Sequence, residues 1–373
     1  MAGTISNVED DDRFSFSSSN FSVQELVKQP IKTIPQHYVR QPVPSAPCGG
    51  HRPSQMLPTI DMNRLVSGKD FDVELGKLHS TCKDWGFFQL VNHGVNSSIL
   101  EKVKLEVEGF YQLPLVEKMK FRIREGDAEA EGYGSTERDG GKFDWADRFF
   151  MTTNPNHKRK PHLFPQLPSS LRNTLESYIS EVKTLGKKLL CLMAKALDME
   201  EKEMMGYCFD DGMQSLRMTY YPPCPQPELV MGTTSHSDFS LITILHQLNG
   251  VDGLHIHKDG AWFPVSFLPN ALVVNVGDTL EIFSNGVYRS IEHKVVPNVE
   301  KERMSVAFFI NPKFDVQVGP APSLINPQNP PLFKTVSLDQ YVKGFVSHKL
   351  NGKSHLHNMR IDRDGEDKLS LDN

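Results

Sequence analysis

A series of short stretches rich in β-branched and aromatic residues, crowded between Gly212 and Pro312, constrains the fold of this chain most strongly. Such runs are typical of β-strands, and the dipeptides Asp259-Gly260 and Asn285-Gly286 favour the tight turns of hairpins. Many short strands with such turns indicate two stacked antiparallel sheets. We therefore predict a mainly β fold with flanking helices, built on a double-stranded β-helix (jelly-roll) core over residues 212–312. The expected strands are Leu216–Tyr221, Leu241–Leu245, Leu254–His257, Ala271–Val276, Tyr288–Val296 and Ser305–Ile310.

The region before this core mixes both kinds of secondary structure, and we expect a helical and mixed N-terminal region over residues 57–160. Apolar residues at helical spacing predict one helix that Gly86 would end, and residues 97–112 predict another. Two short apolar runs predict strands. The helical positions are Leu75, Leu78, Cys82 and Trp85, and the strands are Leu57–Asp61 and Phe87–Val91.

The longest expected helix lies within residues 161–211. Its apolar side chains alternate three and four residues apart, which suits either a coiled-coil seam or a helix that braces a β-core. Because a β-rich segment follows, we assign residues 161–211 to bracing helices. The apolar positions are Leu175, Tyr178, Val182, Leu185, Leu189, Leu192 and Ala196.

Both ends of the chain are expected to lie outside the core. Residues 1–20 are acidic and serine-rich, and prolines crowd the segment from 35 to 58. We therefore expect residues 1–56 to be a disordered or extended tail. Residues 313–373 are expected to form a C-terminal tail with one helix, at about Leu338–His348, that folds back over the mouth of the barrel.

Composition excludes several classes of function. The net charge of −5 gives no electrostatic footprint for nucleic acid, and the basic cluster His157–Lys160 reads as a solvated turn. No apolar run is long enough to span a membrane, and the first residues lack the features of a signal peptide. The 5 cysteines are scattered without a Cys-x-x-Cys pair, which is typical of reduced thiols. We expect a cytoplasmic monomer that binds neither nucleic acid nor membranes.

A metal site is predicted by His236-Ser-Asp238 together with His293. Strand side chains alternate, so His236 and Asp238 lie on one face of an extended segment, and His293 can join them from a strand crossing the same barrel. Two imidazoles and one carboxylate leave adjacent coordination positions free, which is the arrangement of non-haem Fe(II) oxygenases; Ni, Co and Zn would also be accepted. No catalytic side chain is expected beyond this metal centre.

An anion-binding pair is predicted by Arg303-Met-Ser305. Alternation puts Arg303 and Ser305 on one face of a strand, and a guanidinium fork is the natural partner of a carboxylate. A surface ion pair of Arg303 with Glu300 or Glu302 is the alternative.

These motifs, with several flanking segments, resemble those of plant-type 2-oxoglutarate- and Fe(II)-dependent dioxygenases from about residue 57 into the C-terminal tail. Within that family the chain resembles the branch that acts on plant specialised metabolites, including alkaloid O-demethylases and senescence-related members. One departure is Thr219, where the family usually has an asparagine that can contact the co-substrate. The matching segments are Trp85–Gly94, Tyr220–Asp238, Asn275–Glu281, Ser284–Gly286 and Glu302–Phe308.

The resemblance implies Fe(II), 2-oxoglutarate and O2, with ascorbate as a helpful reductant. It implies that His236, Asp238 and His293 hold the iron. Arg303, Ser305 and Tyr221 would contact the distal carboxylate of 2-oxoglutarate, although a purely structural hydroxyl is the alternative for Tyr221.

Substrate contacts are expected from aromatic side chains. The alternation that carries Arg303 and Ser305 continues to Phe309, which could stack on a flat substrate, and Phe149 could cap the opening with its neighbours. Ordinary core packing is the alternative for both phenylalanines.

Other polar residues have simpler interpretations. His255 and His257 are expected to face solvent from a strand whose Leu254 and Ile256 point inward. His93 is expected to hold a turn by hydrogen bonding. Asn275 and Asp278 are interpreted as residues that fix the backbone of a turn.

The favoured function is oxidation of an aromatic plant specialised metabolite, such as an alkaloid or flavonoid, by hydroxylation or O-demethylation. A sister oxidase that uses ascorbate in place of 2-oxoglutarate, a zinc hydrolase on the same ligands, and a non-catalytic small-molecule-binding protein are the alternatives. The shape of the pocket decides the substrate.

Overall fold

The computed structural model describes residues 22–31, 33–40, 56–66, 68–127, 130–135, 137–138, 141–208, 212–347 and 352–361. The acidic tail expected at residues 1–20 lies outside the described residues. So do residues 41–55 of the proline-rich segment and His348 at the end of the expected C-terminal helix.

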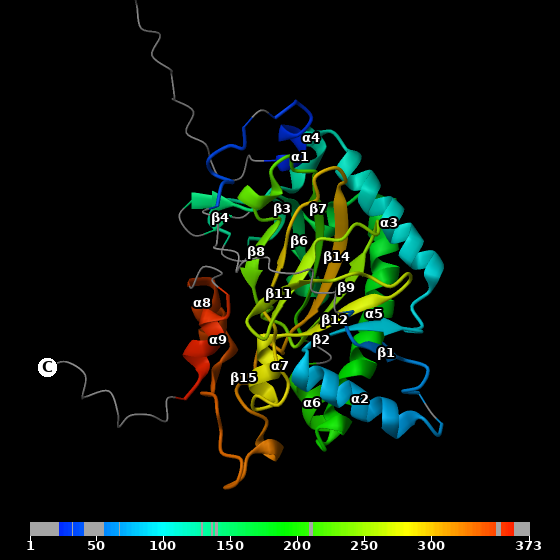
Figure 1. Cartoon of the computed structure of the whole chain (residues 1–373), viewed down its shortest axis with the longest axis vertical. Coiled ribbons are helices and arrows are strands. Elements are labelled where there is room, and N and C mark those ends of the chain that lie inside the picture. Colours follow the sequence, from blue (N-terminus) through cyan, green and yellow to red (C-terminus); the bar gives the residue numbers. More distant parts are fainter. Residues whose placement is uncertain are drawn as a thin grey trace, which may run out of the picture.

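Two β-sheets form the core of the molecule, as the jelly-roll prediction requires (Figure 1). All strand pairs in them are antiparallel except β1 with β2. The eight-stranded sheet runs in the order β1 (Thr59–Asp61), β2 (Phe87–Val91), β12 (Leu272–Val276), β9 (Ile242–Gln247), β14 (Arg303–Ile310), β7 (Gln214–Tyr221), β6 (Asp147–Asn154), β3 (Gly132–Gly134). The four-stranded sheet runs in the order β11 (Ala261–Pro264), β10 (Leu254–Lys258), β13 (His293–Val295), β8 (Thr233–His236).

The two sheets are joined by a small apolar cluster between their facing surfaces. Leu254 and Ile256 of β10 and Val295 of β13 pack there with Phe87 of β2 and Val273 of β12. The alternation expected for β10 is confirmed, because its two apolar residues are buried while His255 and His257 are only half-buried. The polar side chains described below gather beside this cluster.

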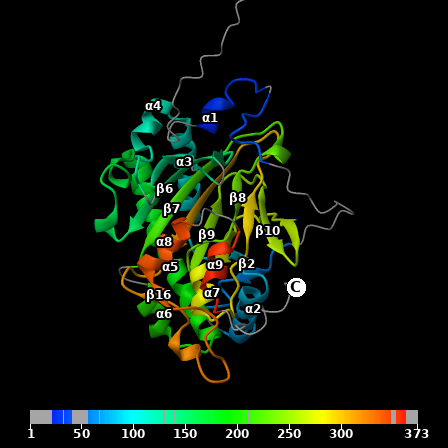
Figure 2. The same ribbon diagram turned by 90° about the vertical axis from the view of Figure 1, so that its left-hand side faces the viewer.

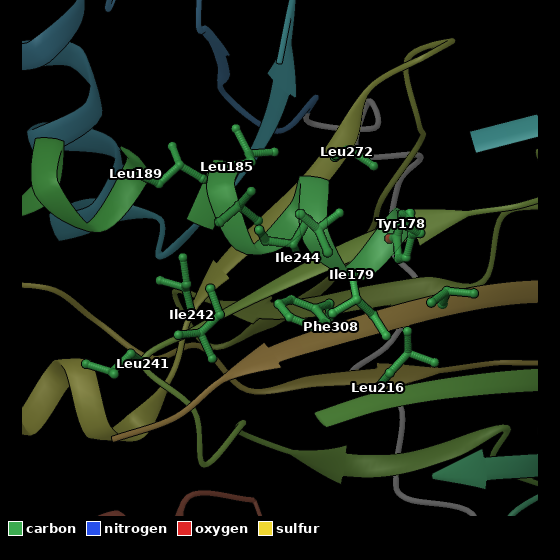
Figure 3. Close-up of a cluster of buried hydrophobic side chains, with 14 of the residues drawn as sticks. Tyr178, Ile179, Leu185, Leu189, Leu216, Leu241, Ile242, Ile244, Leu272 and Phe308 are labelled. Carbon is green, nitrogen blue, oxygen red and sulfur yellow. The ribbon is translucent and has the colours of Figure 1, made fainter. Parts of the chain in front are cut away.

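The other face of the eight-stranded sheet is covered by the long helix α5 (Ser169–Ala196) (Figures 1 and 3). The predicted apolar stripe is buried from Leu175 to Leu189, whereas its last two positions, Leu192 and Ala196, are half-buried. Figure 3 shows Tyr178, Ile179 and Leu185 of α5 close to Ile244 and Phe308 of the sheet. A Cβ atom added at Gly186 would collide with Cδ1 of Ile310, so the helix lies tightly on the strands. The long helix therefore braces the β-core and is not a coiled-coil seam. The helices that contact α5 are α2 (Phe71–Asp84), α3 (Ser97–Gln112) and α6 (Glu201–Cys208), and the short helix α4 (Leu115–Lys118) follows α3.

One predicted hairpin is confirmed and one is wrong. Asp259-Gly260 joins β10 to β11 with positive φ angles of 49° and 74°. Asn285-Gly286, by contrast, follows helix α7 (Asp278–Phe283) and joins no pair of strands. The Asn285 side chain accepts from Leu332 N and donates to the Pro330 carbonyl, so this turn anchors the C-terminal tail. The expected strand Tyr288–Val296 is correspondingly confined to β13.

The N-terminal segment departs from the expectation of a disordered or extended tail. Residues 22–40 contain the short helix α1 (Val23–Leu26), and Val23, Ile34 and Tyr38 are buried against Trp145. The carboxylate of Asp147 accepts hydrogen bonds from Ser22 and from Val23 N, which caps α1 from a strand far along the sequence. A small hairpin of β4 (Glu137–Arg138) and β5 (Lys142–Phe143) lies next to this segment, where Phe143 N donates to His37 O.

The C-terminal tail contains the predicted helix as α8 (Leu338–Ser347) and an additional short helix, α9 (Ser354–Met359). A two-stranded sheet of β15 (Gln317–Val318) and β16 (Val336–Ser337) precedes α8. Figure 2 shows α8 and α9 beside α7. No helix within the described ranges is long and apolar enough to cross a membrane.

Candidate active site

The two histidines and the aspartate of the predicted metal site come together. His236 ends β8 and is the register partner of His293 in β13, and Asp238 lies two residues beyond the strand. The Nε2 atoms of His236 and His293 lie 3.5 Å and 3.7 Å from Oδ1 of Asp238. All three side chains are buried, and one possible ligand atom from each lies within 4.8 Å of the others.

Hydrogen bonds orient both imidazoles so that Nε2 faces the centre of this triad. Nδ1 of His236 lies 2.8 Å from the Thr234 carbonyl, and Nδ1 of His293 lies 3.1 Å from the Ile291 carbonyl. A carbonyl can only accept, so Nδ1 carries the proton and Nε2 keeps its lone pair. Nε2 of His236 is buried without a hydrogen-bond partner. Burial and the neighbouring His236 lower the pKa of His293 to about 4, which keeps that ring neutral near pH 7.

The carboxylate of Asp238 is oriented in the same way. Its Oδ2 accepts hydrogen bonds from Thr243 Oγ1 at 2.6 Å and from Asn275 Nδ2 at 2.8 Å, which leaves Oδ1 facing the imidazoles. Burial alone would raise the pKa of Asp238, but the adjacent His293 and His236 hold it well below its ordinary value. Two imidazole nitrogens and one carboxylate oxygen, each oriented by a hydrogen bond on its far side, suit a divalent transition metal such as Fe(II).

The interpretation of Asn275 and Asp278 as turn residues is wrong. Asn275 lies in β12, where its side chain supports Asp238 directly. Asp278 begins helix α7, donates from its backbone N to the Asp238 carbonyl at 2.7 Å, and accepts from Ser237 Oγ at 2.9 Å. Burial raises the pKa of the Asp278 carboxyl to about 7.

Arg303 is buried in β14, directly opposite Tyr221 of β7. Its Nε lies 3.2 Å from Gln247 Oε1 and its Nη1 3.4 Å from Ser305 Oγ, while Nη2 is buried without a hydrogen-bond partner. Arg303 forms no salt bridge with a carboxylate of the described chain, so a surface ion pair with Glu300 or Glu302 is wrong. A buried guanidinium with an unused donor is a site for an anion.

Tyr221 lies beside this guanidinium. Its hydroxyl lies 3.0 Å from Thr233 Oγ1, and the Arg303 guanidinium lies 5.1 Å from the centre of its ring. The triad lines one cavity between the two sheets together with Arg303, Ser305 and Tyr221. Its other lining residues are Phe87, Arg217, Thr233, Thr243, Leu245, Leu254, Asn275, Val295 and Ala307.

A second cavity adjoins the first and shares Arg217 and Thr233 with it. Thr219 is the register partner of Ser305, yet it lines this second cavity and not the one that holds Arg303. The other residues of the second cavity are Ser135, Asp144, Ala146, Arg148 and Gly232.

The two phenylalanines proposed to contact the substrate lie in different places. Phe149 is fully buried in the main core, where it stacks on Phe110 with ring centres 5.2 Å apart, so it does not cap the opening. Phe309 is half-buried on the face of β14 that carries Arg303. It lies 6.3 Å from Phe150, and the Arg217 guanidinium is 5.2 Å from its ring. Alternation along β6 turns Phe150, and not Phe149, toward this side of the sheet.

The sequence motifs did not single out Arg217 or Thr243, and Phe150 was considered only as one of the neighbours of Phe149 that could cap the opening. Arg217 could have been found, because the alternation that includes Tyr221 and Thr219 on β7 continues to it. His93 holds a turn as expected: its Nε2 lies 3.1 Å from the Asn270 carbonyl, and its Nδ1 accepts from Val95 N at 3.1 Å.

A jelly roll that brings two histidines and an aspartate opposite a buried, unpaired arginine defines a 2-oxoglutarate- and Fe(II)-dependent oxygenase, and this chain belongs to that family. Residues 212–312 match the 2OG-Fe(II) oxygenase superfamily. Residues 57–169 match the family described as non-haem dioxygenase in morphine synthesis N-terminal.

Among curated proteins, the chain is 47% identical to oxoglutarate-dependent flavonoid 7-O-demethylase 1 of Ocimum basilicum, over 91% of each protein. It is 46% identical to codeine O-demethylase of Papaver somniferum, over 91% of this chain and 96% of that one. It is 48% identical to protein SRG1 of Arabidopsis thaliana, with the same coverage. Among solved structures, JOX2 in complex with 2OG, Fe and JA superposes with a TM-score of 0.80 at 31% identity, over 91% of this chain and 98% of that one.

Proposed function

We propose that this oxygenase hydroxylates or O-demethylates an aromatic plant specialised metabolite of the flavonoid or alkaloid type. The observation that carries the proposal is the shared cavity. An imidazole Nε2 without a partner and a guanidinium Nη2 without a partner face one space between the sheets. The imidazole Nε2 suits a metal ion, and the guanidinium Nη2 suits a carboxylate. A 2-oxo dicarboxylic acid needs both contacts.

In this proposal His236, Asp238 and His293 hold the iron. With 2-oxoglutarate and O2, the bound iron supplies an oxidant strong enough to remove hydrogen from a C–H bond, and 2-oxoglutarate becomes succinate and CO2. The protein contributes position, because the hydrogen bonds behind each ligand fix the direction of its donor atom.

Arg303, Ser305 and Tyr221 bind the distal carboxylate of 2-oxoglutarate. The guanidinium supplies charge and a two-pronged donor, and Ser305 adds a hydroxyl. These carboxylate contacts favour an oxygenase that uses 2-oxoglutarate over an oxidase that uses ascorbate as its co-substrate. Ascorbate has the smaller role of keeping the iron reduced.

Phe309 forms an aromatic wall for the prime substrate, together with Phe150. Their edge-to-face pair presents apolar surface next to the triad's cavity, and the named relatives that act on flavonoids and alkaloids support a flat, aromatic substrate. Phe149 has no part in this wall.

The proposed setting is a cytoplasmic monomer. Cys82, Cys191, Cys208 and Cys224 are free thiols, which suits a reducing compartment. Residues 57–160, 161–211 and 212–312 would act as one unit, since the bracing helix covers the sheet that carries the carboxylate contacts.

The test is incubation of the Fe(II) protein with 2-oxoglutarate, ascorbate and a panel of methoxylated flavonoids, alkaloids and coumarins, followed by mass spectrometry. We expect a product that has lost a methyl group, with formaldehyde, or one that has gained oxygen, and succinate in equal amount. His236→Ala is the control without a complete triad and should give no product. Product formed without 2-oxoglutarate, or no product and no succinate with any compound, would overturn the proposal.

A further inference from the structure

The strand that carries His236 lies at the edge of its sheet. β8 is the last strand of the four-stranded sheet, with β13 as its sheet neighbour. On its other side the C-terminal tail runs parallel to it: Gly352 forms a bridge with His236, and Gly352 N donates to the Ser235 carbonyl at 3.4 Å. The tail thus covers an edge that would otherwise be open beside a metal ligand.

The tail is fastened there by a buried carboxylate. Glu281 of α7 is 2% exposed, and it accepts from Lys353 Nζ at 2.9 Å, from Arg360 Nη2 at 3.1 Å and from Ser290 N at 2.8 Å. Lys353 Nζ also donates to the Ser290 carbonyl at 2.6 Å. One carboxylate therefore joins both ends of the segment 353–360 to the backbone that leads into His293.

The residues next to the metal ligands in the sequence contact helix α7 and the C-terminal tail. Phe239, which follows Asp238, packs on Tyr341 and Phe345 of α8 with ring centres 5.2 Å and 5.4 Å apart. Ser237 is held by Asp278 of α7. The ligand side chains point into the cavity while the residues next to them grip α7 and the tail.

We propose that residues 352–360 form a strap that holds the backbone of His236 and Asp238 in place relative to His293, with Lys353 and Glu281 as positioning residues. This inference rests on the proposed metal role of the triad. A metal site needs its ligands fixed within about half an ångström. Loss of the Lys353 partner would leave the charge of the buried Glu281 carboxylate uncompensated, which is strongly unfavourable. We therefore expect this loss to release the strap.

The test compares Lys353→Met with Lys353→Arg, which keeps the charge. Lys343→Met is the matched control, because it removes an exposed ion pair with Asp339 in the same tail without touching Glu281. The primary measurement is Fe(II) affinity by anaerobic equilibrium dialysis, without substrate. We expect Lys353→Met to lose about 10-fold to 100-fold in Fe(II) affinity, the range typical when support behind metal ligands is lost. Lys353→Arg should regain most of it, and Lys343→Met should match wild type.

Arg360→Met is the second variant, since its partly exposed side chain can be removed with less risk to folding. It should weaken Fe(II) binding in the same direction but less. Unchanged Fe(II) affinity in Lys353→Met or, if that variant does not fold, in Arg360→Met would overturn the strap. An equal loss in Lys343→Met would overturn it too, because general weakening of the tail would then explain the effect. Wild type that binds no Fe(II) would instead contradict the proposed metal site.

Discussion

The side-chain amide of Asn275 donates a 2.8 Å hydrogen bond to Oδ2 of Asp238, and this bond leaves only Oδ1 directed at the two imidazoles. Asn275 lies in β12 of the eight-stranded sheet, whereas Asp238 lies in the loop after β8 of the four-stranded sheet. Their contact therefore sets which carboxylate oxygen is available as a ligand.

We expect Asn275→Leu, which keeps the size but removes the donor, to lower Fe(II) affinity about 10-fold to 100-fold. The reason is that the Asp238 carboxylate then loses one of the two hydrogen bonds that hold it and can rotate away from the ligand position. Asn173→Leu, on the exposed side of α5, is the control and should bind Fe(II) as wild type does. Equal Fe(II) affinity in Asn275→Leu and wild type would show that Thr243 alone orients the carboxylate.

Arg303→Lys should weaken 2-oxoglutarate binding while leaving the affinity for the prime substrate unchanged. The lysine keeps the charge but loses the fork, and one charged hydrogen bond is worth roughly 1.5–3 kcal/mol, or about one to two orders of magnitude in affinity. Succinate release measured against 2-oxoglutarate concentration tests this, with Ser305→Ala expected to show a smaller shift. An unaltered 2-oxoglutarate dependence in Arg303→Lys would remove Arg303 from the site.

Phe149→Ala and Phe309→Ala should separate stability from substrate binding. Phe149 is fully buried in the core, so its truncation should lower the free energy of unfolding by about 3–5 kcal/mol. Phe309→Ala should cost less stability and raise KM for an aromatic substrate about two- to tenfold, as expected for one lost stacking contact. Denaturant unfolding and initial rates measure the two effects, and an unchanged KM in Phe309→Ala would reject the aromatic wall.

The metal-free protein should lose stability as the pH falls from about 6.5 to about 4. Burial lowers the pKa of His246 to about 4, and its Nδ1 has no hydrogen-bond partner. The unfolded chain therefore binds a proton in this pH range that the folded chain does not, so the full stability is present only above the ordinary histidine pKa. His293 contributes in the same direction.

His246→Leu should flatten this pH dependence, by an amount on the order of 3 kcal/mol at pH 4. Denaturant unfolding at several pH values measures it, with His157→Leu on the surface as the control. A pH profile that is as steep in His246→Leu as in wild type would assign the acid sensitivity to other groups.

Local patterns predicted the elements whose burial repeats regularly. The stripe on α5 and the alternation on β10 each report one buried side, and the sequence shows that side directly. The triad and the pair Arg303 and Ser305 could also be predicted from the sequence, because alternation along a strand decides which residues share a face.

Contacts between residues far apart in the sequence could not be predicted from such local patterns. Phe149 and Phe150 are adjacent on β6, where Phe149 is buried in the core and Phe150 is half-buried beside Phe309, and hydrophobicity alone could not tell which ring lies on which face. Helix α7 was missed because it is short and its polar residues Asp278 and Glu281 are buried by partners far along the chain. The folded N-terminal segment depends in the same way on Asp147.

The histidines of the triad belong to the four-stranded sheet, whereas Arg303, Ser305 and Tyr221 belong to the eight-stranded one. In the proposed function, a co-substrate that contacts both the metal and Arg303 must span the gap between the sheets. The distance between the two sheets then limits the length of the co-substrate. A dicarboxylic acid one carbon shorter or longer than 2-oxoglutarate could make one of these contacts only at the expense of the other. The apolar side chains packed between the sheets, among them Phe87, Leu254 and Val295, thereby take part in selecting the co-substrate.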